Sequence, residues 1–194
     1  MIEFLQRGAG FSSGVRSPRV ADLRTGPLRL VPIRPEMLIA EHNSDGVELG
    51  RLLGAKLTYQ WPPVEWDPHV YRIIQKQYEE WPESYGWHRY VLLERGIGKQ
   101  NMLVGAVGGF PRPYGDVEIA YSTVSEFQRR GYATAFATKL VEFLLEQDGV
   151  MSVSAQAYPL VQESIKVMGR CGMSFVGEGN EQGTVRYRRM KSEG

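Results

Sequence analysis

A short polar turn between a predicted strand and a long amphipathic helix constrains the fold of this chain more than any other feature. The turn reads Gln-Arg-Arg-Gly-Tyr-Ala-Thr and spans residues 128–134. Residues 117–124 before it have the composition of a strand, and Asp148-Gly149 closes the helix as a glycine C-cap. Apolar residues recur at helical spacing in between, at Ala133, Phe136, Ala137, Leu140, Phe143 and Leu144. A strand followed directly by such a helix predicts a domain in which helices pack on a sheet.

The same turn has the chemistry of an anion site. Gly131 permits a tight backbone turn, and the first amides of the helix have no partner within it, so they can hold a phosphate at the positive end of the helix dipole. Arg129 and Arg130 add positive charge beside these amides. The alternative is a purely structural turn. The turn is not a Walker loop, because it lacks Gly-Lys-Ser/Thr, and it is not a dinucleotide fingerprint, because it lacks three spaced glycines.

The other periodic segments predict a mixed order of strands and helices. Residues 28–32 alternate like a first strand, and residues 33–37 lead into a helix. Asp67-Pro68 starts a second helix, with Trp81 on its core face and Pro82 as its stop. A turn rich in Pro and Gly lies at residues 111–116, and the strands on either side of it are expected to pair as an antiparallel meander. Further strands are expected at 88–94, 102–110, 117–124, 150–157, 173–176 and 184–190, with a short helix at 161–171.

The chain is long enough for one domain with its own core. Its 194 residues contain no repeat with a period of 20 to 50 residues, which excludes a solenoid. Residues 8–27 mix Gly, Ser, Arg and Pro without an apolar period. We therefore expect residues 1–27 to form an N-terminal arm or lead-in and residues 28–194 to form the domain.

Charge and cysteine content exclude several classes of protein. There are 23 Lys and Arg against 22 Asp and Glu, a formal charge of +1, so nucleic-acid binding is not expected. The single cysteine, Cys171, cannot form an internal disulfide and is expected to be buried. His42, His69 and His88 lack metal-ligand spacing, so no metal is expected. Without an export signal or a span of ~20 apolar residues, the sequence predicts a cytoplasmic protein that does not enter a membrane.

Three segments together resemble the Gcn5-related N-acetyltransferase (GNAT) superfamily. Its phosphate loop, Gln/Arg-x-x-Gly-x-Gly/Ala, stands here as Gln128 to Ala133. Residues 117–124, Val-Glu-Ile-Ala-Tyr-Ser-Thr-Val, are similar to the family's fourth strand. Residues 159–173 look like the Asn-x-x-Ser-Ile helix, ending in Gly-Phe, of the branch that contains ribosomal-protein N-terminal acetyltransferases. The resemblance covers residues 28 to 190, with the three motifs in the family's order and spacing.

The resemblance implies a fold of the α/β (α+β) class: a single domain with a mixed, mostly antiparallel, splayed sheet flanked by helices. It also implies that acetyl-coenzyme A enters between the family's fourth and fifth strands, where its amide-rich pantetheine arm pairs with free backbone groups. Thr123 and Val124 are then expected to hold the pantetheine arm, and Ser164 to contact the cofactor. The pyrophosphate is expected on the loop residues Gln128, Arg129, Arg130, Gly131, Tyr132, Ala133 and Thr134.

Glu118 is the candidate general base. The resemblance places it at the acidic position that many superfamily members carry on this strand, from which it takes the proton of the acceptor amine directly or through water. The alternative is a strand residue that faces solvent. A partly apolar surrounding that raises its pKa would suit the role.

Two departures from the family's pattern bear on the chemistry. Val161 stands where the family usually has asparagine, so a polar contact near the pantetheine arm is lost or replaced. Met168 and Gly169 stand near the helix position at which many relatives carry a tyrosine as general acid. The group that reprotonates the leaving thiolate is therefore unassigned, with Tyr158 as a weaker candidate.

The sequence thus predicts an acyltransferase that moves an acetyl group from acetyl-coenzyme A to a primary amine of a small molecule or a protein N-terminus. The departures favour one alternative, a catalytically weak acetyl-coenzyme A-binding sensor of the same fold. A third reading, an unrelated α/β nucleotide-binding domain, predicts affinity for ATP or NAD instead. The acceptor and the oligomeric state stay open, and pairing of the arm in a homodimer is one of the alternatives.

Overall fold

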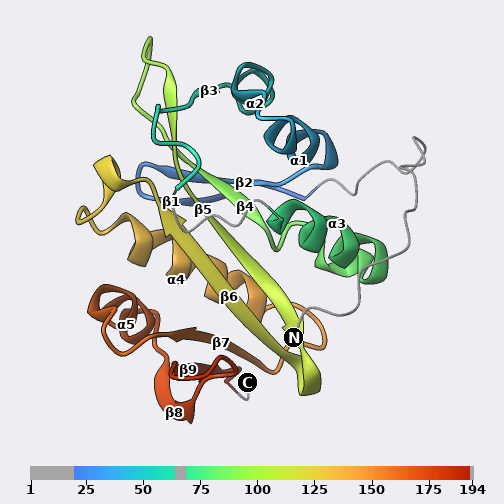
Figure 1. The fold of residues 1–194 in the computed structure, drawn as a ribbon, viewed down its shortest axis with the longest axis vertical. Coiled ribbons are helices and arrows are strands. Elements are labelled where there is room, and N and C mark those ends of the chain that lie inside the picture. Colours follow the sequence, from blue (N-terminus) through green and yellow to red (C-terminus); the bar gives the residue numbers. More distant parts are fainter. Residues whose placement is uncertain (1–19, 64–68, 193–194) are drawn as a thin grey trace.

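The computed structural model describes residues 20–63 and 69–192, which form a nine-stranded sheet with helices on both faces (Figure 1). The strands are β1 (Leu23–Thr25), β2 (Leu28–Pro32), β3 (Ala55–Lys56), β4 (Arg89–Leu93), β5 (Asn101–Arg112), β6 (Asp116–Thr123), β7 (Ser152–Ala157), β8 (Ser174–Glu178) and β9 (Val185–Met190). The α-helices are α1 (Pro35–His42), α2 (Gly46–Leu53), α3 (Val70–Glu80), α4 (Tyr132–Leu145) and α5 (Gln162–Arg170). Short 3-10 turns lie at Pro82–Ser84, Pro113–Gly115 and Ser125–Phe127.

The sheet is mixed and mostly antiparallel, as the sequence predicts. Its strand order is β1-β2-β4-β5-β6-β7-β9-β8, and the short β3 pairs with β5 off this path. Only the β6–β7 and β3–β5 pairs of the described sheet are parallel. β5 and β6 form the expected antiparallel meander, which runs from the pair Gly105–Thr123 to the pair Arg112–Asp116.

The sheet is splayed between β6 and β7. These strands pair only at their first residues, as Asp116–Ser152, Val117–Val153 and Glu118–Ser154. Beyond this point β6 continues along β5 to Thr123, while β7 continues along β9 to Ala157. Figure 1 shows the two strands running apart from their shared end. Ile119, Tyr121 and Thr123 thus have no partner in β7, and the side of β6 that they form is called the free edge of β6.

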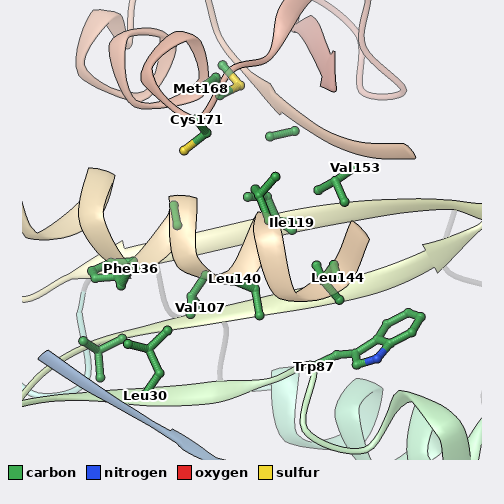
Figure 2. Close-up of a cluster of buried hydrophobic side chains, with 14 of the residues drawn as sticks. Leu30, Trp87, Val107, Ile119, Phe136, Leu140, Leu144, Val153, Met168 and Cys171 are labelled. Atoms are coloured by element: carbon green, nitrogen blue, oxygen red, sulfur yellow. The ribbon is translucent and has the colours of Figure 1, made fainter. Parts of the chain in front are cut away.

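α4 packs its apolar face on the sheet and forms the larger core (Figure 2). Phe136, Leu140 and Leu144 are fully buried there. They lie against sheet residues that include Val107 and Ile119. The 14 residues of α4 confirm the amphipathic helix expected after the turn. Burying such side chains supplies the main stabilisation of the fold, about 25 cal/mol per Å² of apolar surface removed from water.

Cys171 closes this core from the end of α5, as the sequence predicts. Cys171 is 1% exposed, and the Thr138 hydroxyl lies 3.5 Å from its sulfur. Burial raises the pKa of the Cys171 thiol above its ordinary value. A buried thiol of this kind behaves as a small apolar side chain.

A second core lies on the opposite face, under α1, α2 and α3. Leu49 and Leu53 of α2 are buried there, beside Met37 of α1 and Ile74 of α3. α2 was not expected from the sequence, because eight residues with two buried positions give little periodic signal. The Asp45 carboxylate starts α2 by accepting the Glu48 amide at 2.9 Å, and a left-handed glycine ends it.

Two boundaries differ from the sequence expectations. β1 pairs with β2 up to Thr25–Leu28, so the sheet begins at Leu23 rather than near Leu28. Trp81 was expected in the core but is 44% exposed, because α3 ends at Glu80 and the backbone turns at Trp81. The rest of the expected arm, residues 1–19, and the expected cap at Asp67-Pro68 lie outside the described residues.

None of the described helices is long and apolar enough to cross a membrane. Within the same ranges, no three His, Cys, Asp or Glu side chains are grouped so that they could hold a metal ion.

Candidate functional site

The turn at residues 128–134 connects the end of β6 to α4 in a strained backbone conformation. Arg129 has φ of 58°, and Gly131, the N-cap of α4, has φ of 78°. A Cβ at Gly131 would meet no atom within 4 Å, so glycine is required for the left-handed backbone rather than for space. Both left-handed residues lie within the expected phosphate loop.

The amides of this loop are available to a ligand. In the described part of the chain, the amides of residues 129–134 have no hydrogen-bond acceptor, and the next amide, of Ala135, donates to the Gly131 carbonyl at 3.1 Å. Gly131 provides no side-chain cap for α4. Uncapped amides at a helix start combine with the helix dipole to favour an anion. A helix start of this kind can bind an anion.

The loop side chains divide into two roles. Gln128 Nε2 donates to the Thr123 carbonyl at 3.0 Å. Arg130 Nη2 donates to the Glu126 carbonyl at 2.9 Å, and the Arg130 guanidinium lies over the Phe127 ring. These two side chains shape the loop. The Arg129 side chain makes no hydrogen bond or ion pair with any described residue, so its charge is left for a ligand.

The end of β6 offers buried polar and apolar groups next to the loop. Thr123 is buried, and its hydroxyl has no hydrogen-bond partner among the described residues. Val124 is also buried, and its amide donates to the Val104 carbonyl at 2.9 Å. Because a buried hydroxyl without a partner costs free energy, a ligand that supplies one would be stabilised at Thr123.

Ser164 and Tyr121 are in contact between α5 and β6. Tyr121 lies on the free edge of β6, and its hydroxyl donates to the Ser164 carbonyl at 3.0 Å. Ser164 is half-buried in the first turn of α5, and its own hydroxyl makes no hydrogen bond to described residues. Val161 is the N-cap of α5, is 44% exposed and provides no side-chain cap. Among the described residues, no side chain caps this helix start, where the family usually has asparagine.

Glu118 does not face solvent; it is 8% exposed at the point where β6 and β7 part. Its carboxylate accepts hydrogen bonds from Gln156 at 3.2 Å, Asn180 at 3.1 Å and Arg112 at 3.3 Å. Arg186 Nη2 lies 3.6 Å from Glu118 Oε2. The surroundings are therefore polar and cationic rather than apolar, and these contacts hold the carboxylate in one position.

A buried polar network continues from Glu118 to Asp116. The Asp116 carboxylate accepts the Ser152 hydroxyl at 2.6 Å, the Ser154 hydroxyl at 2.7 Å and Arg186 Nη2 at 2.8 Å. This network was not predicted from the sequence, because its members come from three strands that are distant along the chain. The only signal of this network in the sequence was the alternation of polar residues along β7 and β9.

A second carboxylate cluster, also missed, lies on the α1 side of the sheet. The Glu41 carboxylate accepts the Trp61 indole at 2.9 Å and the Tyr90 hydroxyl. Burial raises the pKa of Glu41 to about 7, and the two hydrogen bonds oppose this rise. The neighbouring Gln60 side chain accepts the Glu126 amide at 3.1 Å, which links this cluster to the turn after β6.

A splayed mixed sheet that leads to an uncapped helix start is the architecture of a GNAT-type acyltransferase. The family model described as an acetyltransferase (GNAT) domain matches residues 35–174, so the chain belongs to this acetyltransferase family. A search of curated proteins finds no match.

Solved structures of acetyltransferases share the fold. A ribosomal-protein-S5-alanine acetyltransferase from Vibrio fischeri is 14% identical with a TM-score of 0.59, over 90% of this chain and 98% of that one. A ribosomal L7/L12 α-N-protein acetyltransferase in complex with coenzyme A is 16% identical with a TM-score of 0.55, over 86% and 95%. A microcin C7 self-immunity acetyltransferase in complex with acetyl-coenzyme A and AMP is 13% identical with a TM-score of 0.55, over 86% and 93%. Ribosomal-protein acetyltransferases are thus among the chains that share this fold, as the resemblance predicted.

Proposed function

We propose that this protein transfers an acetyl group from acetyl-coenzyme A to a primary amine. The observation that carries the proposal is the parting of β6 and β7 after Glu118–Ser154, which opens the edge of β6 that leads to the open amides of residues 129–134. Two of the similar structures hold coenzyme A or acetyl-coenzyme A, which supports this choice of acyl donor.

In this proposal the cofactor lies along the free edge of β6. Its pantetheine arm takes the place of a neighbouring strand, because the amides and carbonyls that point away from β5 need partners. Thr123, Val124 and Ser164 contact the arm. The pyrophosphate binds the amides of the loop, with the Arg129 guanidinium beside it. No metal takes part.

Glu118 is the proposed base. Its ionised carboxylate takes a proton from the acceptor amine, directly or through water, and the neutral nitrogen then attacks the thioester carbonyl. Arg112 and Arg186 fix the carboxylate beside the point where the strands part. An anchored carboxylate of this kind acts mainly through its position.

The acceptor is a primary amine of a small molecule or a protein N-terminus in the cytoplasm. A ribosomal-protein-S5-alanine acetyltransferase among the similar structures supports the protein N-terminus as one acceptor type. A panel of short peptides and small polyamines, assayed with radiolabelled acetyl-coenzyme A, separates the two types.

A thermal-shift titration tests the donor. A ligand that binds only the native state raises the unfolding midpoint with its concentration, so acetyl-coenzyme A and desulfo-coenzyme A are expected to raise it, and ATP and NAD are not. A shift with ATP or NAD alone would overturn the proposal. Coenzyme A binding without acetylation of any amine would instead favour the sensor alternative, which the exposed Val161 at the start of α5 supports.

A further inference from the structure

Tyr121 connects the free edge of β6 to helix α5. Ile119, Tyr121 and Thr123 alternate along the free edge of β6 on the face that packs against α4. The Tyr121 ring is half-buried at this core, and its hydroxyl reaches α5 at the Ser164 carbonyl, 3.0 Å away. The hydroxyl therefore lies between the free edge of β6 and α5, beside the residues that would hold the pantetheine arm.

The surroundings keep this phenol protonated. Burial raises the pKa of Tyr121 above its ordinary value, the nearby Cys171 thiol raises it further, and the hydrogen bond to Ser164 opposes the rise. Such a group donates a hydrogen bond at any pH at which the protein is folded, and it does not compete for the proton of the acceptor.

The helix position at which relatives carry a tyrosine offers no donor here. Met168 is buried against α4, and Gly169 has no side chain. Tyr158, the other candidate, is 52% exposed in the turn before α5, where water weakens any hydrogen bond it makes.

We propose that the Tyr121 hydroxyl donates a hydrogen bond to the sulfur of coenzyme A as the thiolate leaves. The inference rests on the proposed function, since it requires the cofactor to lie along the free edge of β6. The hydroxyl turns from the Ser164 carbonyl to the sulfur. The Ser164 carbonyl keeps a hydrogen-bond partner when the hydroxyl turns away. A carbonyl inside an α-helix also accepts a hydrogen bond from the amide four residues later in the chain.

The step balances without a further reactant. The amine nitrogen forms a bond to the thioester carbon, the carbon–sulfur bond breaks, and its electron pair stays on sulfur. Tyr121 keeps its proton and stabilises the new charge as a preorganised donor. Glu118 takes the proton that the ammonium form of the acceptor loses before attack, water takes the second proton that the nitrogen loses as the amide forms, and the thiolate later takes a proton from water.

The test is the pKa of the coenzyme A thiol when bound to the protein. Thiolate absorbance is followed against pH as the difference between the coenzyme A and desulfo-coenzyme A complexes, which cancels Cys171 and the tyrosines. The wild-type protein is expected to lower the pKa of the bound thiol relative to free coenzyme A. Tyr121→Phe is expected to raise it by about one unit, the size of one charge-assisted hydrogen bond. Its kcat is expected to fall ~100-fold with little change in the Kd of coenzyme A.

Tyr78→Phe is the matched control, because the Tyr78 hydroxyl also donates to a backbone carbonyl, that of Ile33, at 3.2 Å. It is expected to leave the pKa of the bound thiol and kcat unchanged. 3-Fluorotyrosine at position 121 keeps the ring and strengthens the donor, so it is expected to lower the pKa of the bound thiol further, even if Tyr121→Phe fails to fold.

Three outcomes are distinct. An unchanged thiol pKa in both position-121 variants would overturn the role of Tyr121 while leaving the proposed function intact. The same kcat loss in Tyr78→Phe would show that Tyr121 acts only through stability. A wild-type protein that binds neither coenzyme A compound would overturn the proposed function and this inference with it.

Discussion

Glu118 and Ser154 form the last backbone pair between β6 and β7, so the candidate base lies where the two strands part. The side chain of Ser154 donates to Asp116, the other acid of the same network, at 2.7 Å. The divergence of the strands and the fixed position of the carboxylate thus arise from the same group of contacts. Chemistry at this point would use a rigid base beside a free strand edge.

Replacing Glu118 by glutamine tests this arrangement. We expect Glu118→Gln to lower kcat by ~10²- to 10⁴-fold, because the amide cannot accept the amine proton, and to leave the Kd of acetyl-coenzyme A nearly unchanged. Steady-state kinetics and a binding titration measure the two effects. Asp116→Asn is the control, since it disturbs the same network through Arg186 without removing the base. An equal loss of kcat in the control would assign Glu118 a structural role.

Gly131 and Gly149 allow the strain of the loop to be separated from its function. Both have φ near +75°, and a Cβ at either would meet no atom within 4 Å. Substitution by alanine is expected to destabilise either variant by ~1 kcal/mol in a urea titration, because an L-residue is strained in this region. Only Gly131→Ala is expected to weaken acetyl-coenzyme A binding. Equal affinities in the two variants would show that the loop does not hold the cofactor.

The pH dependence of stability is expected to carry the signature of Glu41. Its folded-state pKa of about 7 lies above the ordinary value of 4.5, so between these two values the folded state binds more protons than the unfolded state. The free energy of unfolding should therefore contain a contribution that is present below pH 4.5 and lost as the pH rises to about 7. Urea titrations between pH 4.5 and 8 measure it.

Glu41→Gln is expected to remove this contribution, because its amide does not titrate. The exposed Glu36 on the same helix serves as the control, and Glu36→Gln should keep the wild-type pH profile. A profile that is the same in all three proteins would mean that Glu41 titrates near its ordinary pKa.

Cys171 is expected to react slowly with thiol reagents. Its side chain is buried, and burial raises its pKa, so little thiolate is exposed at neutral pH. Since it is the only cysteine, Ellman's reagent should release its chromophore only after unfolding. Cys171→Ala is expected to retain kcat within a few-fold. Rapid labelling of the native protein, or loss of activity in a stable variant, would point to a role for the thiol in catalysis.

The sequence by itself determined the elements whose signal is local. The apolar period after Gly131, the Pro- and Gly-rich turn before β6 and the alternation in β5 and β6 are properties of contiguous residues, and the structure confirms all three. The loop motif also led to the family, because its residues are adjacent in the chain. The individual cofactor contacts stay predictions.

Only the tertiary structure decided where the sheet parts and what surrounds Glu118. Asn180 reaches Glu118 across 62 residues of sequence, and Arg186 reaches Asp116 across 70. The same holds for Tyr90 and Glu41, which are 49 residues apart. Such contacts depend on strand register and on burial by distant segments, neither of which has a period along the chain. Charge, hydrogen bonding and pKa at the site therefore follow from the fold.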